Sequence, residues 1–346
     1  MQVPNKSSPL VIINFKYYGR QVSASIGITF YPQVDEMDAD HLLRQADQAM
    51  YQAKLSGKNR YHVFDAEQDR SVRGHREGLE RIRSALTERE FLLHYQPKVD
   101  LVNGEVAGAE ALIRWQHPQK GLLSPGAFLH YLNGSDLEIE VGEWVIESVL
   151  QQIEVWNAKG ISLVVSANIS ADHLLHTEFS ERLRLALERH PKVAPNTLEL
   201  EILETAAMYD MTQAVGALTR CRELGVQISL DDFGTGYSSL SYLRNLPVHT
   251  LKIDQSFVRD MLNDPADLGI VVSVVQLAQT FNRAVIAEGV ETMEQGAMLV
   301  HLGCRFMQGY GIGRPMPADQ ITDWIRQWHE NAIWRTLNDN TSHLLD

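Results

Sequence analysis

The stretch Thr197–Asp232 reads TLELEILETAAMYDMTQAVGALTRCRELGVQISLDD and determines the fold class of this chain. Its first part, Thr197–Leu203, and its last part, Gln227–Asp232, have the length and the apolar side chains of buried strands. Between them, Met211–Leu224 places apolar residues at helical spacing. Two parallel strands need a crossover connection, which is usually a helix. The stretch therefore predicts a β-α-β unit of a parallel sheet.

The same alternation of strand and helix continues on both sides of this unit. Six further strands are expected at Leu92–Leu101, Val106–Trp115, Ser162–Ile169, Thr250–Asp254, Ala284–Gly289 and Cys304–Gly309. Further helices are expected at Val141–Lys159, Glu178–Arg189, Leu268–Phe281, Met293–Leu302 and Ala318–Leu337. Eight strands over about 250 residues match a (β/α)₈ barrel, and an open doubly wound sheet is the alternative. The short Asn103-Gly104 turn predicts a hairpin, so one strand should run antiparallel to the rest.

The residues before the barrel fit a smaller α/β segment and a connecting helix. Gln21–Tyr31 has the β-branched and aromatic residues of a strand, Asp40–Ser56 has helical spacing, and a short strand follows at Tyr61–Phe64. A helix is expected from about Asp69 to about Arg89. The predicted domain limits are a partial α/β segment at 1–66, a linker helix at 67–89, the barrel at 90–335 and a tail at 336–346.

Composition and charge restrict the function classes. The 346 residues are 44% hydrophobic and 22% charged, and the net charge of −13 argues against binding to duplex nucleic acid. No run approaches the roughly 18 apolar residues of a membrane span. The polar opening Met1–Pro9 lacks the apolar core of a signal peptide, and Cys221 and Cys304 lie far apart. We therefore expect a cytoplasmic protein, unless a segment upstream of this sequence anchors it to a membrane.

Acidic and amide side chains lie at the carboxyl ends of the expected strands. They are Glu110, Asn168, Glu201, Asp231, Asp232, Asp254, Glu288 and Gln308. In a barrel those strand ends meet at the face where active sites lie. A single acid there is explained as well by capping of the following helix. Five of them on one rim favour a site, and these five are Glu110, Glu201, Asp231, Asp232 and Glu288.

Five carboxylates in one cleft repel each other unless cations neutralise them. Oxygen ligands suit Mg²⁺ or Mn²⁺, and two such ions together with Lys252 balance five negative charges. Adjacent strand residues normally face opposite ways, but the turn at Gly234–Gly236 would let both Asp231 and Asp232 turn inward. One carboxylate could then bridge two ions. A two-metal site activates water for in-line displacement at phosphorus.

Two further motifs give weaker signals. Gly234–Ser239 follows a strand, but it lacks the third glycine of the dinucleotide-binding motif and the lysine of a P-loop. We interpret it as a mobile catalytic loop. His173 and His176 lie three residues apart without an HExxH pattern, so we expect a pair of surface residues rather than a zinc site.

Taken in order, the motifs of about Glu90–Arg335 resemble those of the EAL-domain cyclic di-GMP phosphodiesterases. The matching motifs are Glu110-Ala111-Leu112-Ile113-Arg114, Asn168-Ile169-Ser170, Glu201-Ile202-Leu203-Glu204, Asp231-Asp232-Phe233-Gly234, Lys252-Ile253-Asp254, Glu288-Gly289-Val290-Glu291 and Gln308-Gly309-Tyr310. Residues 21–65 resemble the carboxyl-terminal half of a GGDEF domain. They carry Ser25-Ile26-Gly27 and the run Ala46–Tyr51, without the signature loop that names that domain.

The resemblance implies a (β/α)₈ barrel that hydrolyses cyclic di-GMP to linear pGpG in bacterial second-messenger signalling. It implies two ions, Mg²⁺ or Mn²⁺, with the metal-site residues Glu110, Asn168, Glu201, Asp231, Asp232, Glu288 and Gln308, of which Glu288 and Gln308 would hold metal-bound water. It implies catalytic roles for Lys252, Glu288 and Glu204, with Glu204 anchoring the loop after Asp232. It also implies substrate contacts for Arg114, Gln96 and Asp254.

The chain departs from the family pattern at two places. Leu203 stands where family members commonly have threonine, and Gly311-Ile312-Gly313 replaces bulkier residues. Two functions stay open, an active phosphodiesterase and a module that binds cyclic di-GMP without cutting it. The complete set of ligand residues favours the enzyme. Cyclic di-GMP is the expected partner, and a homodimer is considered.

Overall fold

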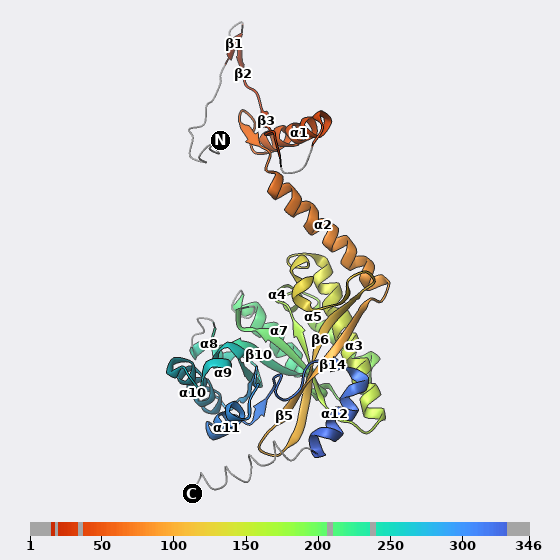
Figure 1. Cartoon of the computed structure of the whole chain (residues 1–346), viewed down its shortest axis with the longest axis vertical. Coiled ribbons are helices and arrows are strands. Elements are labelled where there is room, and N and C mark those ends of the chain that lie inside the picture. The colour runs from red at the N-terminus through yellow and green to blue at the C-terminus, as the bar shows by residue number, and fades with distance from the viewer. Residues whose placement is uncertain (1–14, 18–19, 34–36, 206–209, 236–239, 331–346) are drawn as a thin grey trace. The chain divides into compact units, whose positions relative to one another are not determined.

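The computed structural model describes residues 15–17, 20–33, 37–205, 210–235 and 240–330 (Figure 1). The chain divides into two compact units, Met1–Gly78 and Leu79–Asp346. Among the described residues, no helix combines the length and the apolar character that crossing a membrane requires. The larger unit contains the whole series of strands on which the candidate site residues lie.

The smaller unit is built from short strand pairs and one packed helix. Its elements are β1 (Phe15–Tyr17), β2 (Arg20–Val22), β3 (Ile26–Ile28), α1 (Ala39–Leu55) and β4 (Tyr61–Val63), and α2 (Ala66–Thr87) follows. The strand expected over Gln21–Tyr31 is present but interrupted, because β2 ends at Val22 and the chain pairs again only in β3. A Cβ at Gly27 would lie 1.8 Å from the carbonyl oxygen of Ala46, so glycine is what lets α1 pack closely on β3.

The larger unit is a closed barrel, which confirms the predicted fold class and excludes the open sheet. The barrel strands are β5 (Phe91–Asp100), β6 (Glu105–His117), β8 (Val164–Ile169), β9 (Leu198–Leu203), β10 (Gln227–Phe233), β11 (Thr250–Ile253), β12 (Ala284–Ala287) and β13 (Phe306–Met307). The barrel closes because β5 pairs with both β6 and β13. It runs antiparallel to both neighbours, as the hairpin predicted. The short strands β7 (Gly121–Leu123) and β14 (Met316–Pro317) extend the edges of β6 and β5.

Helices lie outside the strands of this unit (Figure 1). They are α3 (Asp136–Ala158), α4 (Ala171–Leu174), α5 (Phe179–Arg189), α7 (Met211–Glu223), α8 (Leu240–Asn245), α9 (Gln255–Asp260), α10 (Pro265–Thr280), α11 (Met293–His301) and α12 (Ala318–Glu330), with 3₁₀ turns at Pro125–Ala127, Leu129–Tyr131 and Pro195–Thr197. The helix α3 begins five residues before its predicted start, because Asp136 and Glu138 favour the positive end of the helix dipole. The predicted end of the last helix lies outside the described residues.

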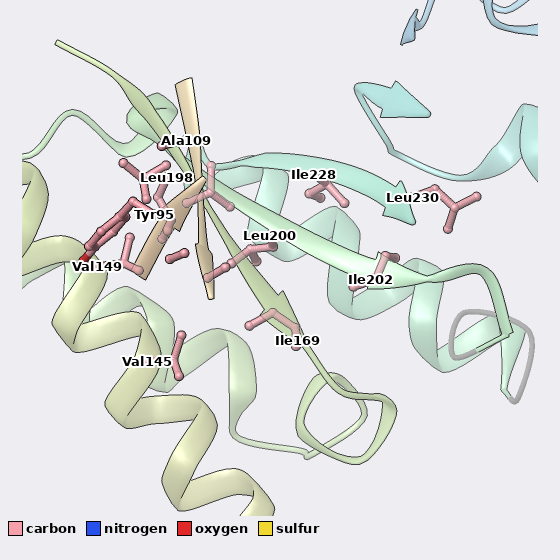
Figure 2. Close-up of a cluster of buried hydrophobic side chains, with 14 of the residues drawn as sticks. Tyr95, Ala109, Val145, Val149, Ile169, Leu198, Leu200, Ile202, Ile228 and Leu230 are labelled. Atoms are coloured by element: carbon pink, nitrogen blue, oxygen red, sulfur yellow. The ribbon is translucent and has the colours of Figure 1, made fainter. Parts of the chain in front are cut away.

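The hydrophobic core lies between the strands and the helices. Leu198, Leu200 and Ile202 of β9 are fully buried and belong to the same cluster as Val145 and Val149 of α3 (Figure 2). Because successive side chains of a strand point to opposite faces, the residues between them, at positions 199 and 201, face the barrel interior. On β9, the apolar side chains thus pack toward the helices, and the polar side chains Glu199 and Glu201 face the barrel interior.

His173 contradicts its predicted place on the surface. Its side chain is 1% exposed, and its ring packs edge-on against Phe179 at a centroid distance of 4.7 Å. A Cβ at Gly142 would lie 2.3 Å from His173 Nδ1, so the ring fills the space over that glycine. Burial lowers the pKa of His173 to about 4, so the ring is neutral and packs as part of the core.

Candidate active site at the barrel mouth

The ammonium of Lys252 lies among four of the predicted acids. Its Nζ is 2.6 Å from Glu288 Oε1, 2.7 Å from Glu201 Oε2, 3.0 Å from Asp231 Oδ1 and 4.0 Å from Glu110 Oε2. Lys252 is 1% exposed. These acids come from β6, β9, β10 and the end of β12, so the parallel strands bring together residues that are far apart in sequence.

The backbone at Asp232 turns both aspartates toward this cluster. Asp232 has a φ of +53° and Gly234 has a φ of +101°, and the pairing of β10 with β11 shifts register between Leu230 and Phe233. A positive φ is uncommon outside glycine, but aspartate adopts it more readily than most residues. Oxygen atoms of Asp231, Asp232 and Glu288 consequently lie within 4.8 Å of one another, close enough to hold a metal ion.

Glu110 joins the cluster to an amide network. It accepts hydrogen bonds from Asn168 Nδ2 at 2.8 Å and from Gln308 Nε2 at 2.6 Å. The same Gln308 nitrogen donates to Gln96 Oε1 at 3.0 Å, and Gln96 Nε2 donates to the carbonyl of Gly313. Gln308 Oε1 is buried without a partner. A buried acceptor of this kind fits a site completed by a cation and its bound water.

Glu204 connects the end of β9 to the turn after β10. It is fully buried, and its Oε2 accepts a hydrogen bond from the Gly234 N–H at 3.1 Å. Leu203, beside it, is 43% exposed and lies opposite Asp231 in the strand pairing. The predicted mobile loop continues into residues 236–239, which lie outside the described residues.

Arg114 and Asp254, two of the predicted substrate contacts, do not contact Lys252. Arg114 is half-buried on β6, and its Nη1 donates to the carbonyl of Ile113 at 2.9 Å. Asp254 caps α9 by accepting a hydrogen bond from the Ser256 N–H at 3.0 Å. Its charge and its hydrogen bond also contribute to the raised pKa of Asp232, which places it beside the metal-site acids.

Burial and mutual repulsion shift the pKa values of the acids in this cluster. Burial, together with the charges of Asp231 and Glu110, raises the pKa of Glu288 to about 8. Burial and the charges of Asp231 and Asp254 raise the pKa of Asp232 to about 6. Burial opposes the ionisation of Glu201 too, but Lys252 and Lys98 hold the pKa of Glu201 at about 2. Divalent ions would displace the protons held by Glu288 and Asp232.

Sequence reading missed a second buried lysine at this site. Lys98 Nζ lies 2.6 Å from Glu201 Oε1 and 3.0 Å from Glu199 Oε2, and it also donates to Ser166 Oγ. The signal was present in the spacing. Gln96 and Lys98 are two residues apart on one strand, as are Glu199 and Glu201 on another, so each pair faces the same side of its strand.

Comparison with known proteins assigns the family. A family model described as the EAL domain matches residues 79–315. The chain belongs to the EAL domain family. A second model, described as the diguanylate cyclase GGDEF domain, matches residues 11–60. Both resemblances predicted from the motifs are thereby confirmed.

Relatives of this EAL domain chain include two curated proteins and a solved structure. The bifunctional diguanylate cyclase/cyclic di-GMP phosphodiesterase MucR of Pseudomonas aeruginosa is 42% identical over 302 residues, which cover 87% of this chain and 44% of MucR. The cyclic di-GMP phosphodiesterase PdeR of Escherichia coli is 37% identical over 311 residues, which cover 90% of this chain and 46% of PdeR. The structure described as the PaMucR phosphodiesterase in complex with c-di-GMP is 43% identical, with a TM-score of 0.68, and the match covers 71% of this chain and 99% of that one. The chain spans less than half the length of these curated relatives.

Proposed function

We propose that this chain is a metal-dependent phosphodiesterase that hydrolyses cyclic di-GMP to linear pGpG. The observation that carries the proposal is the convergence of Glu110, Glu201, Asp231 and Glu288 around Lys252 at the carboxyl ends of the barrel strands. Membership of the EAL family supports it, as do relatives named for this activity. Acidic side chains at this face of a barrel are typical of an active site.

Two Mg²⁺ or Mn²⁺ ions fit the donor set. Asp231 and Asp232 would hold one ion, and Glu288, whose oxygen lies within 4.8 Å of theirs, would hold metal-bound water together with Gln308. Glu110, Asn168 and Glu201 would hold the other, with Asp231 shared between the two. Oxygen donors of this kind suit hard divalent cations. When bound, the two ions activate water and stabilise the charge that develops in an in-line displacement at phosphorus.

The remaining side chains bind the substrate and take part in proton transfer. Arg114 binds a phosphate of cyclic di-GMP, because a guanidinium matches phosphate geometry, and Gln96 and Asp254 provide further polar contacts. Lys252 holds the attacking water and offsets negative charge on the phosphate. The water oxygen bonds to phosphorus and its proton passes to the acidic cluster, which includes Glu288. The bond from phosphorus to the 3′ oxygen breaks, and that oxygen takes up a proton to leave linear pGpG.

The direct test is incubation with cyclic di-GMP and Mg²⁺ or Mn²⁺, with the products separated by chromatography. We expect pGpG from the wild type, none in EDTA, and a loss of about 10²-fold or more in rate for Glu201→Gln, which weakens both a metal ligand and the contact with Lys252. Glu188→Gln, on the exposed face of α5, is the matched control and should react at the wild-type rate. Binding of cyclic di-GMP without formation of pGpG would establish the alternative, a receptor module.

A cytoplasmic location and a homodimer belong to the same proposal. The location is supported by the two buried cysteines Cys221 and Cys304, which form no disulfide. Cell fractionation would check the location. Analytical ultracentrifugation over a range of protein concentrations would check the homodimer.

A further inference from the structure

The two carboxylate oxygens of Glu201 are bound by two different lysines. Lys252 Nζ donates to Oε2 at 2.7 Å, and Lys98 Nζ donates to Oε1 at 2.6 Å. The Glu201 side chain is fully buried. The carboxylate therefore has one partner within the metal-site cluster, Lys252, and a second partner on its other side.

Lys98 is held in a single position by its own contacts. An ammonium has three donors, and those of Lys98 go to Glu201, Glu199 and the hydroxyl of Ser166. Ser166 Oγ in turn donates to Glu199 Oε2, which closes the network. Its three partners come from β8 and β9, so Lys98 on β5 reaches past β6 to the next two strands of the barrel.

The Lys98 network lies one layer deeper in the barrel than the metal-site residues. Ser166 precedes Asn168 by two residues on β8, and Glu199 precedes Glu201 by two on β9. The strand β5 runs in the opposite direction, so Lys98, two residues after Gln96, lies at this deeper level as well. Side chains two residues apart share a face of the strand, and the deeper layer therefore supports the one above it.

The Lys98–Glu199 pair does not change the net charge at the mouth of the barrel. Lys98 carries one positive charge and Glu199 one negative charge, so the pair leaves the balance between the five mouth acids, two divalent ions and Lys252 unchanged. What Lys98 adds is a fixed hydrogen bond to one chosen oxygen of Glu201. A partner that orients a metal ligand from behind typically changes metal affinity or activity by about 10–100-fold when it is removed.

We propose that Lys98 is a positioning residue for the metal site: it holds Glu201 Oε1 from the deeper layer and so directs Oε2 to the mouth for a divalent ion. The proposal rests on the proposed function, because it requires Glu201 to be a metal ligand. A role of Lys98 through its charge and a role through positioning predict opposite changes in cation affinity when Lys98 is removed. If Lys98 acts only through its charge, its removal strengthens the binding of a cation, whereas loss of positioning weakens it.

The test is calorimetric titration of the whole chain with Mn²⁺, without substrate. Lys98→Met removes the donor, and the double variant Lys98→Met/Glu199→Gln removes both charges, so the net charge of the site stays that of the wild type. We expect both variants to bind Mn²⁺ about 10–100-fold more weakly than the wild type. Lys159→Met, at the exposed end of α3, is the control for a lost surface lysine and should bind as the wild type does.

Circular dichroism and thermal melts establish that each variant is folded. If both lysine variants fail to fold, Ser166→Ala decides, because it keeps every charge and removes only one partner of Lys98; weaker Mn²⁺ binding is expected. A folded double variant, or in its place Ser166→Ala, that binds Mn²⁺ as tightly as the wild type would overturn the positioning role alone. Absence of Mn²⁺ binding by the wild type would overturn the proposed metal site, and the role of Lys98 with it.

Discussion

Lys252 Nζ lies 2.6 Å from Glu288 Oε1, so a fully buried ammonium contacts the carboxyl group whose pKa is raised to about 8. Glu201 and Asp231 lie within 3.0 Å of the same nitrogen. Carboxylates this close repel one another unless a cation lies between them. The positive charge of Lys252 offsets this repulsion among the acids at the mouth of the barrel.

Lys252→Met should separate chemistry from metal binding. A protonated lysine is no metal ligand, so Mn²⁺ binding should remain. The loss of one preorganised donor should lower kcat by about 10²–10³-fold. Asp231→Ala is the contrasting variant, because it removes a proposed shared ligand and should lose Mn²⁺ binding too. Single-turnover hydrolysis together with calorimetry measures both effects. A near wild-type rate for Lys252→Met would show that the lysine is only structural.

Glu288 should make stability and metal affinity depend on pH. Its pKa rises from an ordinary 4.5 to about 8, so in EDTA the folded protein keeps a proton that the unfolded chain has lost over this range. The free energy of unfolding should therefore fall as pH rises from 4.5 to about 8. Mn²⁺ must displace this proton, so its affinity should rise over the same range. Melts and titrations at several pH values measure this, and Glu288→Gln should flatten both curves above about pH 6, the raised pKa of Asp232.

Glu204 should control the turn that carries Asp232. Glu204→Ala removes the acceptor of the Gly234 N–H, so the turn loses its attachment to β9. We expect Mn²⁺ affinity and kcat to fall by about 10–100-fold. Glu204→Gln keeps an amide oxygen in place of Oε2 and should retain most of the activity. Equal loss in the two variants would mean that the negative charge of Glu204 matters rather than its hydrogen bond.

Divalent ions should stabilise the fold. An ion that binds only the folded protein adds about 2.7 kcal/mol to the free energy of unfolding at a hundredfold excess over its Kd. Thermal melts in EDTA and in millimolar Mn²⁺ should therefore differ in midpoint. Asp231→Ala should show a much smaller shift. An unchanged wild-type midpoint at saturating Mn²⁺ would speak against the cluster as a metal site.

The barrel could be predicted because its strands and helices have distinct patterns. The strand β10 spans Gln227–Phe233 where Gln227–Asp232 was expected, and α7 spans Met211–Glu223 where Met211–Leu224 was expected. The Asn103-Gly104 turn also predicted the antiparallel β5. Both depend on local physics, namely burial of an apolar face and the twist of a tight turn.

What the sequence concealed depends on contacts between distant strands. Lys98 and Glu199 lie inside strands rather than at their ends, and only the closed barrel shows that they meet. A buried lysine nevertheless requires an acidic partner, so the inward-facing Lys98 could have indicated an acidic neighbour inside the barrel. His173 was misplaced because an isolated histidine gives no signal of burial. The space above Gly142 decides its position.

The left-handed backbone at Asp232 restricts that position in two independent ways. Glycine and asparagine accept the conformation but bring no negative charge, and glutamate brings the charge but not the conformational tolerance. Among the common residues, aspartate alone meets both demands. The easiest evolutionary change here, to asparagine, would keep the turn and the fold while removing a carboxylate. A single substitution could thus replace hydrolysis of cyclic di-GMP by binding alone during evolution. No unfolded intermediate sequence would be needed.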